Sequence, residues 1–495
     1  MPAETVTPPA PAPSAPLPDR VSREFLLHHR LCPTGWLPDG AVAVAVTEES
    51  LLGGLDDLSI AYDRPVVSHV VPAQDLDVLI ARLTSAGEVG VELEHEGDDE
   101  TFTSDIRDLA NQPPVVRYVN LLIREAYDAG ASDIHLESTR AGLTTRFRID
   151  GVLLPEIDPP SRLDRAIVSR VKLLADLDIA ERRRPQDGRI RVRLKDRELD
   201  LRVSTVPTVF GESVVLRLLE RGGGAIALEA LGLSADLLAT MQRLAQQPHG
   251  MILVTGPTGS GKTTTLYAAL GLRTAAAEKI ITLEDPVEYS LEGVAQVPVH
   301  AQTGVTFASM LRSILRQDPD VIFVGEMRDT ETAELAVQAA LTGHVVFSTL
   351  HTNDAIGAIP RMLDLGVPPY LVTATLKAVL AQRLVRRICE ACRELYRPEA
   401  GAVTLAEEGG EIPRELVRGR GCAACRGTGF RGRVGIFELL VTTDELQGAI
   451  VAEPSRSRLE QLARAGGMRS LRTDGWEKVR AGVTTAEEVL RVTND

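Results

Sequence analysis

The sequence predicts an α/β fold in which strands and helices alternate around a phosphate-binding loop. Two observations lead to this prediction. Residues 256–263 fit the pattern G-x-x-x-x-G-K-[ST] and directly follow the apolar run 251–255. Further along the chain, short apolar segments recur and each ends in polar residues. This alternation favours a mostly parallel sheet that binds its ligand at the carboxyl ends of the strands.

The glycine-rich loop supplies the groups that a bound nucleotide requires. Its glycines let backbone N–H groups point at phosphate oxygens, and a helix expected over 263–270 adds its positive N-terminal end. Lys262 would reach the β- and γ-phosphates, and the Thr263 hydroxyl would hold Mg²⁺. We therefore predict that ATP and Mg²⁺ bind here, at Gly256, Pro257, Thr258, Gly259, Ser260, Gly261, Lys262, Thr263 and Thr264.

Three further strands are expected over 280–283, 321–324 and 345–349. Polar residues follow each of them. A carboxylate at one strand end is as often a helix cap as a catalyst, but several such ends in a parallel sheet form a common rim. The candidates on this rim are Glu284, Asp285, Glu288, Glu326 and His351.

The rest of the chain divides into segments of different composition. Seven prolines in residues 1–20 predict a disordered tail, and an apolar run over 41–46 predicts a strand in a small domain over 21–95. Residues 96–112 predict an acidic linker. Helical spacing over 115–129 and strand spacing over 143–149 and 199–203 predict an α+β domain over 113–224. The phosphate-loop domain would then occupy 225–495.

Four of the five cysteines form two Cys-x-x-Cys pairs that lie 29 residues apart. Four thiolates at this spacing suit a closed tetrahedral Zn²⁺ site without an open position for catalysis. Iron–sulfur ligation remains an alternative, and disulfides are disfavoured in an intracellular protein. We predict a structural zinc module over about 385–432, with the ligands Cys389, Cys392, Cys422 and Cys425.

Composition limits the classes of partner. A formal charge of -15 disfavours nucleic acid as the general partner. No apolar run approaches the length of a transmembrane helix, and the first residues lack the features of a signal peptide. The sequence therefore predicts a cytoplasmic protein that reaches a membrane only through partners.

Taken together, these motifs resemble the type II secretion and type IV pilus assembly ATPases, a superfamily of hexameric motors. The resemblance runs from about residue 110 to the end of the chain. It implies a RecA-like ATPase core, a preceding PAS-like α+β domain and a small N-terminal partner-binding domain. The segments that carry it are 131–137, 256–263, 282–289, 315–329, 342–354 and the paired Cys-x-x-Cys knuckles.

The resemblance also implies roles for single residues. Glu326 matches the Walker-B glutamate that polarises the attacking water, while Gly325 stands where other phosphate-loop enzymes carry an Mg²⁺-ordering aspartate. Glu284, Asp285 and Glu288 are therefore the candidates for that metal contact. His344 and His351 match the histidine box, and we expect His351 to sense the phosphate state.

Arg202 and Arg217 stand at the positions of the family's arginine fingers, with Arg189 as a third candidate. In a hexamer they would neutralise γ-phosphate charge when domains close. Without the resemblance, arginines on the surface of a strand would be the simpler interpretation.

The predicted function is a homohexameric ATPase at the cytoplasmic face of the inner membrane. It would power pseudopilus assembly in type II secretion and bind secretion-platform proteins through its N-terminal domain. A type IV pilus extension ATPase is the alternative, whereas the paired knuckles disfavour a retraction motor. A non-hydrolysing nucleotide-gated scaffold and a DNA-translocating motor are the remaining hypotheses.

Overall fold

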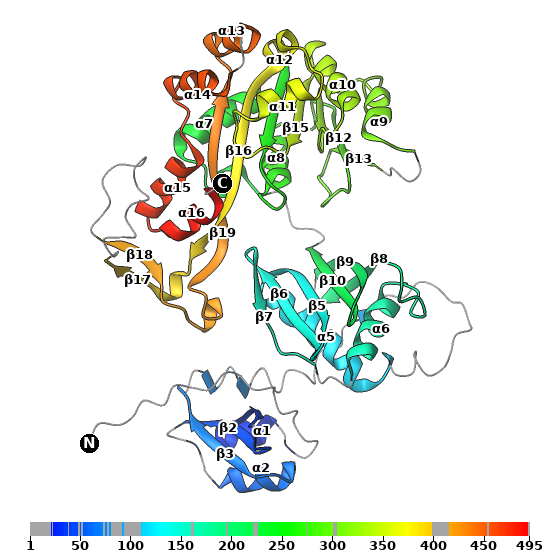
Figure 1. The fold of residues 1–495 in the computed structure, drawn as a ribbon, viewed down its shortest axis with the longest axis vertical. Coiled ribbons are helices and arrows are strands. Elements are labelled where there is room, and N and C mark those ends of the chain that lie inside the picture. The colour runs from blue at the N-terminus through cyan, green and yellow to red at the C-terminus, as the bar shows by residue number, and fades with distance from the viewer. Residues whose placement is uncertain are drawn as a thin grey trace. The chain divides into compact units, whose positions relative to one another are not determined.

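The chain divides into two compact units, Met1–Arg221 and Gly222–Asp495 (Figure 1). The predicted tail over 1–20 and most of the predicted acidic linker lie outside the residues that the computed structural model describes. Those residues are 21–80 (without 22, 38, 48–49, 51–52, 73–74 and 77–78), 92–93, 110–159, 163–194, 197–220, 226–273, 275–299, 304–397, 415–452 and 455–493.

A small three-stranded sheet lies near the N-terminus. Strand β2 (Val42–Val46) lies between β1 (Leu31–Trp36), which is antiparallel to it, and β3 (Val66–Val70), which is parallel. Helices α1 (Arg23–His29) and α2 (Gly54–Tyr62) accompany the sheet. The strand predicted over 41–46 is confirmed as β2.

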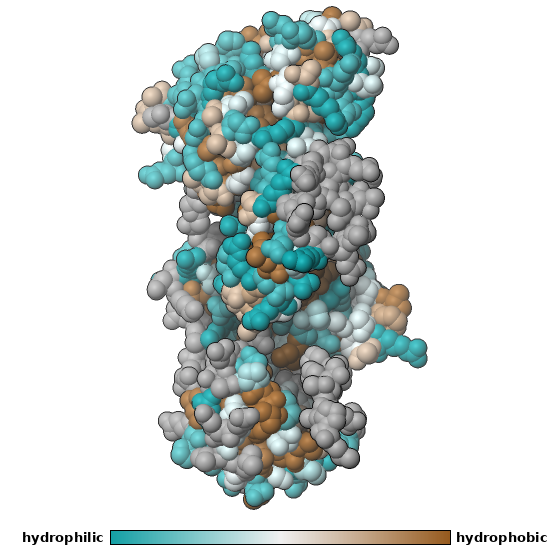
Figure 2. Space-filling view, turned by 90° about the vertical axis from the view of Figure 1, so that its left-hand side faces the viewer, coloured by the Kyte–Doolittle hydropathy of each residue, from teal (hydrophilic) through white to brown (hydrophobic). Residues whose placement is uncertain are grey.

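Strand β3 lies at the edge of this described sheet and is exposed along most of its length. Val67 is 48% and Val70 69% exposed, and Ile60 on α2 is 77% exposed. Figure 2 shows brown apolar surface on this domain, at the bottom of the view. An exposed strand edge with apolar side chains is a typical docking surface for another chain.

The α+β domain consists of an antiparallel sheet with α5 (Pro113–Asp128) and α6 (Asp164–Leu174) packed on one face. Alternation of apolar and polar residues along the strands buries that face and leaves the other polar. In spatial order, the strands are β4 (Glu92–Leu93), β8 (Gln186–Leu194), β9 (Arg197–Thr208), β10 (Gly211–Glu220), β5 (Ala131–Thr139), β6 (Gly142–Ile149) and β7 (Val152–Pro155). The predicted helix and strands of this region are confirmed.

The second unit is built on a mostly parallel sheet, as predicted. In spatial order its strands are β13 (Ala295–Pro298), β12 (Ile280–Glu284), β14 (Val321–Val324), β15 (Val345–Leu350), β11 (Gly250–Thr255), β16 (Leu376–Ile388) and β19 (Phe430–Val441). Only the last of these neighbouring pairs is antiparallel. Strands β11, β14 and β15 are buried throughout because helices cover both faces of the sheet.

Each face of this sheet has its own hydrophobic core. Helices α7 (Ala235–Ala245) and α8 (Lys262–Leu270) contribute to one core. The opposite face packs against α9 (Phe307–Ile314), α10 (Thr330–Leu341), α11 (Ala358–Asp364), α12 (Pro369–Thr375), α13 (Asp444–Ala452) and α14 (Arg456–Ala465). The central strands β11, β14 and β15 thus expose neither face, and the exposed Pro257 and His351 lie beyond their carboxyl ends.

Strands β16 and β19 form a long hairpin that reaches from the sheet to the cysteine module, as Figure 1 shows in yellow and orange. The module contains the small ribbon β17 (Arg393–Tyr396) and β18 (Leu416–Gly419). Leu416 and Tyr396 pack against the C-terminal helices α15 (Leu471–Arg480) and α16 (Ala486–Thr493). The module is therefore tied both to the ATPase sheet and to the end of the chain.

Candidate active site

The carboxyl ends of β11, β14 and β15 lie side by side. Parallel pairing aligns Thr255 of β11 with Leu350 of β15, and Val324 of β14 with Ser348. The residues that follow these strands, including Gly256, Glu326 and His351, consequently lie on one edge of the sheet. This is the rim that the sequence predicted.

The phosphate loop holds its shape through close backbone contacts. Gly256 has φ of +148°, and a Cβ atom there would lie 2.5 Å from the Gln382 carbonyl oxygen, so only glycine fits. Gly261, with φ of +88°, is the N-cap residue directly before α8. The Ser260 hydroxyl is buried and has no hydrogen-bond partner among the described residues. A phosphate oxygen in the loop would satisfy it.

Lys262 folds back over this loop. Its Nζ donates to the carbonyl oxygens of Gly256 (2.8 Å) and Pro257 (3.0 Å). The pKa of Lys262 is lowered to about 8, chiefly by burial; Glu326 opposes this effect, and the positive charge of Arg383 adds to it. Thr263 and Thr264 are half-buried in the first turn of α8. A phosphate would therefore find an ammonium group and two hydroxyls at the start of one helix.

Glu326 and His351 face each other across the rim. Glu326 is 16% exposed; its Oε1 lies 2.8 Å from Arg328 Nε and its Oε2 lies 3.6 Å from His351 Nε2. Burial lowers the pKa of His351, as does the charge of Lys262, whereas Glu326 raises it. A neutral imidazole beside a carboxylate can donate a hydrogen bond to a phosphate without adding charge.

The glycine before Glu326 has a steric cause. A Cβ atom at Gly325 would lie 2.9 Å from the carbonyl oxygen of Leu283 on the neighbouring strand. The departure from the usual Walker-B aspartate therefore follows from the close approach of β12 and β14. The metal contact must come from another residue.

The three acidic candidates for that contact differ in their surroundings. Glu284 is 3% exposed and accepts hydrogen bonds from Thr282 Oγ1 (2.6 Å), Gln296 Nε2 (3.1 Å) and the Tyr267 hydroxyl. Asp285 and Glu288 are exposed. The first carboxyl is thus engaged by protein donors, whereas the other two are accessible to a hydrated ion.

His344 does not join this rim. It precedes β15, and its carbonyl oxygen accepts the N–H of Gly250 at the start of β11. Its Nδ1 lies 2.9 Å from the Ala339 carbonyl oxygen and 3.2 Å from Thr342 Oγ1. A strand of six residues spans about 20 Å, so the two histidines lie at opposite edges of the sheet. Within one chain, the nucleotide-binding role predicted for His344 has no geometric support.

The arginine candidates form one row on the polar face of the α+β sheet. Register pairs Arg189 with Arg202, Arg202 with Arg217, and Arg217 with Asp133 on adjacent strands. Arg217 is 59% exposed and its Nε donates to Asp133 Oδ1 at 2.9 Å. Directly opposed residues share a face, so the three guanidinium groups lie together on this side of the domain.

Two residues beside the phosphate loop were missed in the sequence. Gln382 Oε1 accepts from Thr265 Oγ1 of α8 (2.6 Å), and an Arg383 guanidinium nitrogen donates to the Asn353 carbonyl oxygen (2.7 Å). Both side chains are buried, at 2% and 6% exposure. The available signal was the polar pair inside the otherwise apolar segment 378–385, because buried polar residues are more informative than exposed apolar ones.

The four predicted cysteine ligands come together. Their sulfur atoms lie within 4.8 Å of one another, with shortest separations of 3.7–3.9 Å. A tetrahedral ion with Zn–S bonds of about 2.3 Å places its sulfurs about 3.8 Å apart. Backbone N–H groups of Cys422 and Gly429 point at Cys425 Sγ, at 3.1 and 3.2 Å. The cluster fits one tetrahedral zinc ion and leaves no position for a reacting water.

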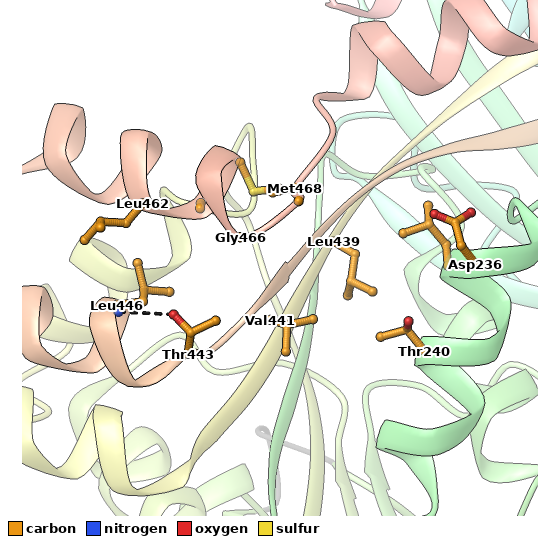
Figure 3. Close-up of a pocket in the computed structure, with 12 residues that line it drawn as sticks. Asp236, Thr240, Leu439, Val441, Thr443, Leu446, Leu462, Gly466 and Met468 are labelled. Atoms are coloured by element: carbon orange, nitrogen blue, oxygen red, sulfur yellow. Dashed lines mark hydrogen bonds between the residues drawn. The ribbon is translucent and has the colours of Figure 1, made fainter.

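A cavity of 140 Å³ lies elsewhere in this unit, between α7, β19 and α14 (Figure 3). It is smaller than the roughly 300–1,000 Å³ of ligand pockets and contains none of the predicted site residues. Asp236 on its wall is paired with Arg469 at 2.8 Å. This cavity therefore has no part in the proposed chemistry.

None of the helices in the described part of the chain has the length and apolar content that crossing a membrane requires.

Comparison with known proteins identifies the family. The model of the type II/IV secretion system proteins matches residues 108–491, and the MshEN domain model matches residues 2–90. Type II secretion system protein E of Xanthomonas campestris is 47% identical over 485 residues, which cover 96% of this chain and 85% of that protein. Type II secretion system ATPase E of Vibrio cholerae is 48% identical over 391 residues, 79% of this chain and 78% of that one.

Two solved structures of ATPases share the fold of this chain. The pilus retraction motor PilT with bound ADP superposes with a TM-score of 0.52 at 28% identity, covering 75% of this chain and 96% of PilT. The Legionella pneumophila ATPase DotB superposes with a TM-score of 0.58 at 19% identity, covering 76% and 95%, which bears on the fold alone. The names of the curated relatives favour the secretion hypothesis over pilus extension. The chain belongs to the type II/IV secretion system protein family, as its motifs predicted.

Proposed function

We propose that this chain is the ATP-hydrolysing motor of a type II secretion system, where it powers pseudopilus assembly. The observation that carries the proposal is the convergence of Lys262, Glu326 and His351 on one sheet edge beside the phosphate loop. A homohexamer at the cytoplasmic face of the inner membrane is the assembly that the family membership supports.

Each of these residues has its own role in phosphoryl transfer. Lys262 exchanges its two carbonyl partners for the β- and γ-phosphates and neutralises their charge. Glu326 orients the attacking water, and His351 donates to the γ-phosphate and reports its presence. Mg²⁺, when bound, would offset the negative charge of the phosphates. Thr263 and the exposed Asp285 or Glu288 would hold it, because Glu284 is occupied by its own donors.

Further positive charge at the rim would come from the arginine row. Arg202 and Arg217, with Arg189 beside them, present guanidinium groups on the open face of a rigid sheet. In a hexamer such a face can close over the nucleotide of another domain and withdraw after hydrolysis. Closure and release of this kind convert ATP turnover into rigid-body movement.

The cysteine cluster would hold a structural zinc ion, because four thiolates complete its coordination. The small N-terminal domain would bind the secretion platform in the inner membrane. Its exposed edge strand β3, with Val67 and Val70, can accept a further strand or pack against an apolar surface. Partners would then attach the chain to the membrane.

Two kinetic measurements test the proposal. Glu326→Gln keeps the shape of the site, so ATP should still bind while phosphate release falls at least about a hundredfold. If Glu326→Gln hydrolyses ATP as fast as the wild type, another carboxylate orients the water. If the wild type itself releases no phosphate, a nucleotide-gated scaffold is favoured. The same assay with added DNA tests the translocation hypothesis, which requires stimulation.

Mixing two inactive variants tests the arginine row. Lys262→Ala lacks the phosphate contact, and Arg217→Ala lacks the guanidinium; co-assembled, they should regain part of the activity if the arginine acts across an interface. Arg140→Ala, a change of an exposed arginine at a turn of the same sheet, is the matched control and should stay active alone. Co-assembly without any rescue would show that Arg217 acts within its own chain.

A further inference from the structure

The loop that follows β15, residues 351–355, is fixed by elements far away in the sequence. We call it the His351 loop. At its start, the Thr352 N–H donates to Thr255 Oγ1 (2.8 Å), and the two threonine hydroxyls lie 2.7 Å apart. Thr255 directly precedes the phosphate loop and is fully buried. The His351 loop and the phosphate loop therefore share an anchor.

Arg383 of β16 makes the second attachment. One of its guanidinium nitrogens donates to the Asn353 carbonyl oxygen (2.7 Å), and another donates to the Gln382 carbonyl oxygen (3.3 Å). That same Gln382 oxygen closes off the space beside Gly256. A single planar side chain thus joins strand β16, where it passes beside Gly256, to the middle of the His351 loop.

Glu438 of β19 makes the third attachment of the His351 loop. Its Oε1 accepts the Ala355 N–H at 2.8 Å, and the carboxyl also accepts the backbone N–H of Leu471. Glu438 is 6% exposed and lies directly opposite Ala381, two residues before Arg383, in the β16–β19 hairpin. The hairpin interior is otherwise mainly apolar. Burying a carboxyl among apolar residues costs free energy unless hydrogen bonds such as these compensate.

We propose that Glu438 and Arg383 are positioning residues for ATP hydrolysis, which hold the His351 loop so that His351 faces Glu326. This inference rests on the proposed role of His351. Neither the Ala355 N–H nor the Leu471 N–H belongs to the rim, so Glu438 acts through the loop and not on the nucleotide. The hairpin that supplies both residues also carries the cysteine module, whose first ligand, Cys389, lies six positions beyond Arg383.

The decisive variant is Glu438→Ala in the full-length protein. Loss of one positioned hydrogen bond should lower kcat about tenfold and leave KM for ATP within about twofold. Glu438→Gln retains an acceptor for the Ala355 N–H and should keep kcat within about threefold of wild type. Glu445→Ala, a change of an exposed carboxylate on α13, is the matched control and should be silent.

A double-mutant cycle separates positioning from general destabilisation. If Glu438 acts through His351, adding Glu438→Ala to His351→Ala should lower kcat less than about twofold further, whereas independent effects would multiply. Multiplying effects, or an unchanged kcat in Glu438→Ala alone, would overturn the inference and leave the proposed function standing. A His351→Ala variant with wild-type kcat would instead refute the role of His351 itself.

A second variant covers the case in which Glu438→Ala does not fold. Arg383→Lys keeps the positive charge near Lys262, but one ammonium group cannot span two carbonyl oxygens in the way a guanidinium does. It should show the same fall in kcat, the same constant KM and the same lack of further loss in the His351→Ala background. A normal kcat in Arg383→Lys would exclude Arg383 as a positioning residue.

Discussion

Replacing Tyr267 by phenylalanine tests how the buried carboxyl of Glu284 is held. Tyr267 is fully buried, and its hydroxyl is one of the three side-chain donors to Glu284. Burial raises the pKa of Tyr267 above its usual range, as does the neighbouring Glu284, so the hydroxyl stays protonated and donates at any working pH. Phenylalanine preserves the ring and opens no cavity. The change removes the hydrogen bond to Glu284 together with the longer contact that Gln296 Nε2 makes with the hydroxyl at 3.3 Å.

The expected loss of unfolding free energy follows from the hydrogen bonds at Glu284. A hydrogen bond to a buried carboxylate contributes about 1.5–3 kcal/mol, and the two remaining donors keep the group partly satisfied. We therefore expect a loss of about 2 kcal/mol of unfolding free energy. For a unit of this size, that corresponds to a fall of roughly 4–8 °C in Tm. Because Thr282 and Gln296 still hold the Glu284 carboxyl, kcat should change by less than about threefold.

Differential scanning fluorimetry and phosphate release measure the two quantities. Tyr289→Phe is the matched control, since the Tyr289 ring packs edge-on against Tyr267 at 4.7 Å but Glu284 takes no hydrogen bond from it. An unchanged Tm in Tyr267→Phe would refute the hydrogen-bond account. A large fall in kcat at an unchanged KM would instead make Glu284 part of the metal site.

Two further predictions concern the zinc module and the phosphate loop. Elemental analysis should find one zinc per chain, and a zinc-free wild type would contradict the prediction. Replacing the four cysteine ligands by serine should speed hydrogen exchange in the module and in α15 and α16, while nucleotide still binds. Calorimetry in buffers of different ionisation enthalpy should show that ATP binding takes up about half a proton at pH 8 and much less at pH 7. The reason is that the free Lys262 has a pKa of about 8 and only its ammonium form binds phosphate. Affinity should accordingly fall as pH rises through 8, and the absence of uptake at pH 8 would show that Lys262 is already fully protonated.

The parts of the site that lie close in sequence were predictable. The phosphate loop sits between an apolar run and a helix, and the cysteine pairs repeat a fixed spacing, so local pattern was enough for both. Strand direction also separates His344 from His351, because His344 precedes β15 and His351 follows it.

Contacts between distant strands were not predictable from one sequence. The row of Arg189, Arg202 and Arg217 depends on the register of three strands, which a shift of one residue would destroy. The attachment of Arg383 to Asn353 likewise needs β16 to lie beside β11. Pairing order is a tertiary choice, and local propensity does not encode it.

The place where the cysteine module leaves the hairpin bears on how such motors diversify. Ile388 and Phe430, at the two ends of the module, are already paired, so a two-residue turn can join β16 to β19 directly. The ATPase sheet therefore does not require the module for closure. Its removal would, however, uncover Trp476 and Val489, on which Leu416 packs. Natural or engineered chains without the module should therefore also have lost α15 and α16, or carry polar residues on that helix face.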